Sequence, residues 1–275
     1  MRKTFFRSAL LVLMACILRP YVVNGCPAGT PGQRIEFHIE APGASRRGAF
    51  AVYVPPCYDP DRKDPYPLLI LLHGHDMSLQ TWDQLGLNAA YSSYAKSVNH
   101  KPYIILTILE SNNLISLNAS EFDLFILNDI LPWVESNFNT GGSRKLRALG
   151  GISRGAYWAA DIVFRHPDIF ETVGLHSLPG SPFYDLEFHY LAEEASENGD
   201  TFNVSLDIGE KDPYGPGSQV FEKQLENEKI PYRSLVQPGD HSLSYWETYL
   251  ADYLTWYGKS FAVDEKSASS GSVAK

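Results

Sequence analysis

The chain has 275 residues, a formal net charge of −9 and 44% hydrophobic residues. This length and composition allow one large α/β domain with a substantial core, and they exclude a wholly disordered chain. The acidic balance, with no basic cluster after the N-terminus, also argues against a nucleic acid partner.

Residues 1–25 have the pattern of a signal peptide. Met1–Arg7 is a basic segment, and Ala9–Leu18 is an apolar run that is short for a membrane span. Residues 26–34 are rich in proline and glycine and are expected to form a linker or tether. We therefore expect a protein that is secreted or anchored to the outer face of the cell envelope.

The three cysteines are too few for a disulfide framework, and no C-x-x-C pair or other metal-ligand cluster occurs. Val23–Cys26 is similar to a bacterial lipoprotein box, which makes lipidated Cys26 a candidate membrane attachment. Leu13–Cys16 is a competing box, and an ordinary secretory cut near Gly25 is the alternative. Cys57 is expected to be a structural rather than a catalytic thiol; it could pair with Cys26, but a lipidated Cys26 could not pair.

The first half of the chain alternates between strand and helix patterns. Residues 33–40 alternate apolar and polar residues, as in a half-exposed edge strand, and residues 68–72 form a continuous apolar run typical of a buried strand. Pro132 should bend the helix that contains it. The strands expected here cover residues 33–40, 49–54, 68–72 and 103–109, and the helices cover residues 81–97 and 121–138.

The second half continues this alternation. The strands expected here lead into the turn at residues 151–155 and cover residues 172–178, 202–208 and 232–236, and the helices cover residues 155–165, 219–228 and 244–257. Residues 179–200 are expected to be an irregular excursion that acts as a lid. Residues 259–275 are expected to be a disordered polar tail.

Strands that alternate with helices predict a largely parallel sheet in one α/β domain, residues 35–258, with two antiparallel strands at its front edge. Ligands of such sheets bind beyond the carboxyl ends of the strands. His73, Ser153, Asp212 and His241 each follow a predicted strand, so we expect one crevice to collect them.

Ser153 lies in the sequence G-I-S-R-G between a predicted strand and a predicted helix. This is the G-x-S-x-G pattern of a nucleophile elbow, in which a sharp turn exposes the serine hydroxyl above the sheet. Gly151 and Gly155 are small where the strand and the helix pass close to each other. The pattern predicts that Ser153 is a catalytic nucleophile.

A serine nucleophile needs a base and an orienting acid. His241 follows the last predicted strand and is the candidate base, because the chain order in this type of site is serine, acid, histidine. Asp212 follows the preceding strand and is the candidate acid. Glu210 is its nearest rival, whereas Asp207 lies inside the strand and is expected to be structural.

An oxyanion hole needs backbone N–H donors. The amide of Arg154, which follows the nucleophile at the start of a helix, is one candidate, and the amide of His75 in the loop after Leu72 is the other. His73 is expected to brace this loop. The sequence identifies no substrate-binding residues, and the unusual Arg154 is the strongest local clue to the substrate.

Together these motifs resemble the esterase D family of α/β-hydrolases. The residues that carry the resemblance are Leu71–Gly74, Trp82, Gly151–Gly155, Asp212, Gly239–His241 and Trp246. The family often has methionine after the serine and glycines after the His-Gly pair, where this chain has Arg154 and His75-Asp76.

The resemblance implies an α/β-hydrolase fold with a mostly parallel, twisted sheet and helices on both faces. It also implies a serine esterase that acts through an acyl-enzyme, without metal or organic cofactor, on a small-molecule or polysaccharide-linked ester. Two alternatives stay open, namely an acyltransferase that uses a sugar or alcohol acceptor and a non-catalytic, ligand-binding member at the cell surface.

Overall fold

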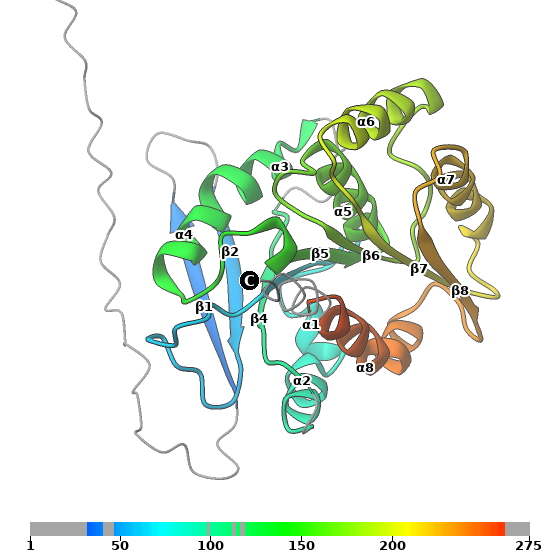
Figure 1. Ribbon diagram of the computed structural model, residues 1–275. Helices are drawn as coiled ribbons and strands as arrows, with labels where there is room; N and C mark the ends of the chain where they lie inside the picture. The colour runs from blue at the N-terminus through cyan, green and yellow to red at the C-terminus, as the bar shows by residue number, and fades with distance from the viewer. Residues whose placement is uncertain (1–31, 41–46, 98–99, 112–113, 116–118, 262–275) are drawn as a thin grey trace, which may run out of the picture.

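The computed structural model describes residues 32–40, 47–97, 100–111, 114–115 and 119–261. An eight-stranded sheet with the order β1-β2-β4-β3-β5-β6-β7-β8 forms its centre (Figure 1). The strands are β1 (Gln33–Glu40), β2 (Arg47–Val54), β3 (Leu68–Leu72), β4 (Ile104–Ile108), β5 (Arg147–Ile152), β6 (Thr172–His176), β7 (Asn203–Gly209) and β8 (Tyr232–Gln237). At one edge, β2 runs antiparallel to both of its neighbours, β1 and β4. The six strands from β4 to β8 in this order are parallel to one another, which confirms the predicted fold class.

Helices cover both faces of this sheet (Figure 1). One face carries α1 (Thr81–Gln84), α2 (Leu87–Ala95) and α8 (Leu243–Ser260). The other face carries α3 (Phe122–Phe125), the π-helical segment η2 (Ile126–Ile130), α4 (Leu131–Asn137), α5 (Arg154–Arg165), α6 (Asp185–Glu197) and α7 (Gly215–Asn227). A short 3₁₀ turn, η3 (Arg144–Leu146), precedes β5. The central strands β3 and β4 are buried throughout, as their continuous apolar sequences predict.

Two predicted helices are interrupted in the structure. The expected helix at residues 81–97 is divided at Gly86, which has a left-handed φ of 79° that ends α1 and starts α2. The expected helix at residues 121–138 widens into the π-helical turn η2 just before Pro132. Proline has no N–H to donate to the preceding turn, and a widened turn relieves the clash of its ring with that turn.

The prediction of an irregular excursion at residues 179–200 was wrong, because α6 occupies most of this stretch. Phe188, Ala192 and Ala195 are its buried residues, and their spacing places them on one face of the helix. The Phe188 ring packs against the rings of Phe164 and Phe221 at 5.1 and 5.4 Å between centroids. Most of the segment is therefore a packed helix of the domain and not an irregular excursion.

The ordered domain extends slightly beyond the predicted residues 35–258. β1 begins at Gln33, α8 ends at Ser260, and the buried ring of Phe261 packs against Tyr103. The predicted signal peptide and most of the predicted tether and tail lie outside the described residues. Within the described ranges, no helix combines the length and the apolar character needed to cross a membrane.

Cys57 is disulfide-bonded. The other two cysteines of the chain, Cys16 and Cys26, lie outside the described residues. Cys57 is therefore a structural half-cystine and not a free thiol.

Candidate active site

Ser153 occupies a sharp turn between β5 and α5, as the sequence pattern predicts. Its backbone is left-handed, with φ 54° and ψ −117°, a conformation that costs on the order of 1–3 kcal/mol in a residue with a side chain. Two hydrogen bonds hold the turn, because the Ser153 N–H donates to the His176 carbonyl at 2.9 Å and the Tyr157 N–H donates to the Ser153 carbonyl at 3.1 Å. The strained turn therefore presents the hydroxyl from a rigid backbone.

The turn needs both of its glycines because backbone segments pass each other closely. A Cβ on Gly155 would collide with the Leu72 carbonyl at the end of β3, and a Cβ on Gly151 would collide with the backbone of Gly155. The start of α5 thus lies directly against the end of β3, and the loop after β3 reaches the side of Ser153.

The structure brings Ser153, His241 and Asp212 into one chain of hydrogen bonds. His241 Nε2 lies 2.9 Å from Ser153 Oγ, and His241 Nδ1 lies 2.8 Å from Asp212 Oδ2. The Asp212 side chain is fully buried, and its Oδ1 accepts a hydrogen bond from the Tyr214 N–H at 2.9 Å. Because an ionised carboxylate only accepts, the proton belongs on Nδ1, which leaves Nε2 free to accept the serine proton.

Two aromatic rings flank the His241 imidazole. The Trp246 ring meets it edge-on at 5.1 Å between centroids, and the Tyr214 ring meets it at 4.8 Å. Trp246 is buried and its Nε1–H donates to Ser177 Oγ at 3.1 Å, whereas Tyr214 is 44% exposed. The imidazole is therefore held between a fixed inner ring and a partly exposed outer ring.

The rival acids do not contact His241. Glu210 is exposed at the end of β7, and its N–H donates to the Gln237 carbonyl. Asp207 is buried within β7 and its Oδ1 lies 2.5 Å from His176 Nδ1. Its Oδ2 accepts hydrogen bonds from the hydroxyls of Tyr245 and Tyr253 at 2.9 and 2.7 Å, and burial together with this carboxylate raises the pKa of both phenols.

The loop after β3 is braced by His73, which is 3% exposed. His73 Nδ1 donates to the Gly74 carbonyl at 2.8 Å, and His73 Nε2 accepts from the Glu110 N–H at 3.0 Å. This pattern is that of a neutral imidazole, and burial lowers the pKa of His73 below its ordinary value.

The two predicted oxyanion donors come from adjoining segments. A Cβ on Gly74 would lie 3.4 Å from the Ser153 Cβ, so the loop after β3 lies against Ser153 there. The Gly74 N–H itself donates to Met77 Sδ at 3.3 Å, and the exposed His75 follows. Arg154 is the first residue of α5, where backbone N–H groups have no partner within the helix.

Glu110 is a site residue that the sequence analysis missed. Its carboxylate, 2% exposed, binds the Arg154 guanidinium through two contacts, at 2.8 Å to Nε and 2.6 Å to one terminal nitrogen. The guanidinium of Arg154, the residue named above as a local clue to the substrate, is thus paired with a carboxylate of the same chain. The signal was present in the sequence, because Glu110 follows a predicted buried strand just as Ser153 and Asp212 do.

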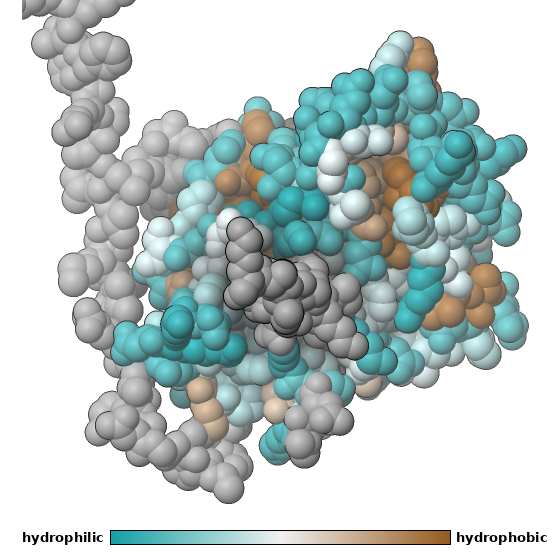
Figure 2. All heavy atoms as spheres, viewed as in Figure 1, coloured by the Kyte–Doolittle hydropathy of each residue, from teal (hydrophilic) through white to brown (hydrophobic). Residues whose placement is uncertain are grey.

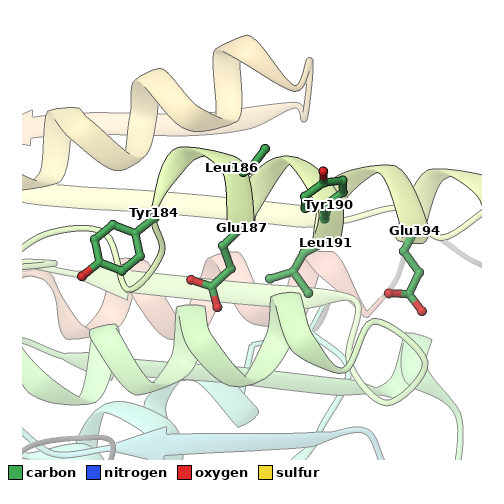
Figure 3. A pocket seen from close by; sticks show the side chains of 6 residues that line it. All are labelled: Tyr184, Leu186, Glu187, Tyr190, Leu191 and Glu194. Atoms are coloured by element: carbon green, nitrogen blue, oxygen red, sulfur yellow. The ribbon is translucent and has the colours of Figure 1, made fainter.

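A shallow hollow of about 460 Å³ lies elsewhere, along α6 (Figure 3). Its lining residues are Tyr184, Leu186, Glu187, Tyr190, Leu191 and Glu194. Glu187 also pairs with Arg165 of α5 at 2.7 Å. Figure 2 shows a largely hydrophilic face with several hydrophobic patches, one of which lies between α6 and α7. The hollow therefore belongs to α6, whereas Ser153, Asp212 and His241 come from the ends of β5, β7 and β8.

Comparisons with known proteins identify the family. A family model described as "Putative esterase" matches residues 43–257. The chain belongs to this esterase family. An endo-1,4-β-xylanase/feruloyl esterase of Xylanibacter ruminicola is 25% identical over 155 residues, which cover 53% of this chain and 21% of that protein. An esterase of Mycobacterium tuberculosis is 30% identical over 125 residues, which cover 42% of this chain and 26% of that protein.

The aligned region thus spans about a quarter of the length of these relatives. Among solved structures, a ferulic acid esterase superposes with a TM-score of 0.74 at 20% identity, covering 84% of this chain and 99% of that one. An S-formylglutathione hydrolase of Staphylococcus aureus superposes with a TM-score of 0.67 at 18% identity, covering 84% and 98%. These superpositions establish the α/β-hydrolase fold of the esterase family member described here.

The lowered pKa of His73 predicts a pH-dependent stability. In the unfolded chain this imidazole binds a proton near pH ~6.5, whereas in the folded chain it binds one only at lower pH. The free energy of unfolding should therefore fall as the pH drops below about 6.5, by up to roughly 1.4 kcal/mol per pH unit from this group.

His73→Gln keeps an acceptor for the Glu110 N–H and does not titrate, so this variant should lose less stability on acidification than the wild type. Urea unfolding of both proteins between about pH 7.5 and 5.5 checks this. Parallel stability curves would show that His73 is not the group responsible.

Proposed function

We propose that this esterase family member is a serine carboxylic-ester hydrolase with Ser153 as nucleophile, His241 as base and Asp212 as orienting acid. The observation that carries the proposal is the continuous hydrogen-bonded chain from Ser153 Oγ through His241 to the buried Asp212, at 2.9 and 2.8 Å. The strained backbone of Ser153 supports it, because such strain concentrates at functional sites.

In the acylation step, Ser153 Oγ attacks the ester carbonyl carbon while its proton passes to His241 Nε2. Asp212 keeps the other ring proton on Nδ1 and stabilises the imidazolium that forms. The tetrahedral intermediate then collapses as the C–O bond to the alcohol breaks. The alcohol oxygen takes the proton from Nε2, which leaves the acyl group bonded to Ser153.

The negative charge on the carbonyl oxygen would be stabilised by the backbone N–H groups of Arg154 and His75. The N-terminus of α5 adds the positive end of its helix dipole. In the deacylation step, water gives a proton to His241 Nε2 as its oxygen attacks the acyl carbon. The bond between that carbon and Ser153 Oγ then breaks, Oγ takes the proton from Nε2, and the acid leaves. The route requires no metal ion or organic cofactor.

The proteins similar to this chain act on more than one class of ester. They include feruloyl esterases and S-formylglutathione hydrolases, which differ in whether the acyl group is bulky and aromatic or small. We propose a small-molecule or polysaccharide-linked ester, and a panel of acetyl, butyryl and feruloyl esters and glutathione thioesters distinguishes the two acyl classes. Product analysis with added alcohol or sugar acceptors separates hydrolysis from acyl transfer.

Ser153→Ala is expected to lower turnover of short p-nitrophenyl esters by at least about 10³-fold and to abolish labelling by a fluorophosphonate probe, because the nucleophile is removed. Ser136→Ala is the matched control, since that hydroxyl lies on α4 and donates to the Pro132 carbonyl. Wild-type turnover in folded Ser153→Ala would refute the proposed mechanism.

Asp212→Asn is expected to lower kcat by roughly 10²–10⁴-fold, because an amide favours the wrong imidazole tautomer while keeping the shape of the side chain. Glu210→Gln changes an exposed carboxylate two residues away and should alter kcat by less than about threefold. Steady-state kinetics of both variants test this, and the opposite ranking would transfer the role of the acid to Glu210.

We also propose that the protein acts outside the reducing cytosol. The signal-like N-terminus and the disulfide at Cys57 support this, since disulfides persist in oxidising compartments. A cut near residue 25 removes Cys16 and leaves Cys26 as the remaining partner in the chain, so this thiol could not then carry a lipid.

The mature exported protein should therefore show a Cys26–Cys57 linked peptide and no acyl mass. Mass spectrometry of non-reduced digests tests this. A diacylglyceryl group on Cys26 would instead favour a membrane-anchored form.

A further inference from the structure

Glu110 is a buried carboxylate at the carboxyl end of β4, two residues beyond the last residue of that strand. Both of its oxygens bind the Arg154 guanidinium, and Oε1 also accepts a hydrogen bond from Ser120 Oγ at 2.9 Å. A charge this deeply buried is stable only when it is paired and hydrogen-bonded, and two-point contact with a planar guanidinium fixes the direction of both side chains.

The backbone of the same residue binds the other side of the site. The Glu110 N–H donates to His73 Nε2 at 3.0 Å, and His73 Nδ1 donates to the Gly74 carbonyl at 2.8 Å. Gly74 lies against Ser153 and precedes His75. A single residue thus connects the loop after β3 with the first residue of α5.

These two segments carry the N–H groups of His75 and Arg154, which are the candidate oxyanion donors. Oxyanion stabilisation depends on donors that are already aimed at the developing charge, and a misplacement of about 1 Å is costly. The Arg154 guanidinium is paired with Glu110 rather than presented as a free cation for an anionic substrate.

We propose that Glu110 is a positioning residue for the oxyanion hole, which fixes the Arg154 amide through its carboxylate and the loop of His75 through its own N–H and His73. This rests on the proposed esterase function. Because the oxyanion exists in the transition state and not in the bound substrate, loss of the contact should lower kcat and leave KM nearly unchanged.

The test replaces both partners at once, since removal of one alone would leave the other charge buried and unpaired. Glu110→Leu with Arg154→Met gives an apolar pair of similar volume and keeps both backbone N–H groups. The matched control replaces the pair of Arg147 and Glu135, joined at 2.7 Å, by the same residue types. Arg147 begins β5, at the end of that strand opposite Ser153.

The Glu110/Arg154 double variant is expected to unfold at nearly the same urea concentration as the wild type. Its kcat for p-nitrophenyl esters should fall by about 10–100-fold with KM within about threefold. Its second-order rate of fluorophosphonate labelling should fall by a similar factor, because the phosphoryl oxygen enters the same hole. The single variant Glu110→Gln keeps the shape of the side chain and one acceptor for the Arg154 guanidinium, so it should lose less kcat than the double variant. The Arg147/Glu135 control should keep the wild-type kcat.

Three outcomes would overturn the proposal. These are a kcat within about twofold of wild type in the folded double variant, an equal kcat loss in the Arg147/Glu135 control, or a change confined to KM. Failure of the esterase function itself is distinguished by Ser153→Ala, because its full activity would reject the nucleophile whatever the double variant does.

Discussion

The close contact between the start of α5 and the end of β3 is the constraint on which the site depends. Gly155 has no side chain where the Leu72 carbonyl passes, so the helix can begin directly beside the strand. This contact sets the sharp turn at Ser153, whose strained φ is held by hydrogen bonds to His176 and Tyr157. It also places the N-terminus of α5, and the Arg154 amide with it, next to the loop that follows β3.

Buried polar groups join the layers of the domain behind this turn. Asp207 of β7 binds His176 of β6, and it accepts hydrogen bonds from the hydroxyls of Tyr245 and Tyr253 on α8. A buried carboxylate is costly unless its oxygens are hydrogen-bonded, and both oxygens of Asp207 are. Since α8 also carries Trp246 against His241, this network and the site share one helix. The buried pair of Asp207 and His176 is thus connected through α8 to the Trp246 ring that contacts His241.

The parts of the structure that follow local rules could be predicted from the sequence. The buried strands are continuous apolar runs, and the chain order of Ser153, Asp212 and His241 follows the order of strand ends. The pair of Glu110 and Arg154 could not be predicted, because it joins residues 44 positions apart and depends on how adjacent loops leave the sheet. α6 was misread because its buried face consists of one phenylalanine and two alanines among charged residues, a weak apolar signal.

The ring contact between Trp246 and His241 has a spectroscopic consequence. Indole emission is quenched by a neighbouring imidazolium and much less by a neutral imidazole. Trp246 is buried, hydrogen-bonded to Ser177 and held edge-on to the His241 ring. The part of the emission that comes from Trp246, one of five tryptophans in the chain, should therefore report the protonation state of His241 without an external dye.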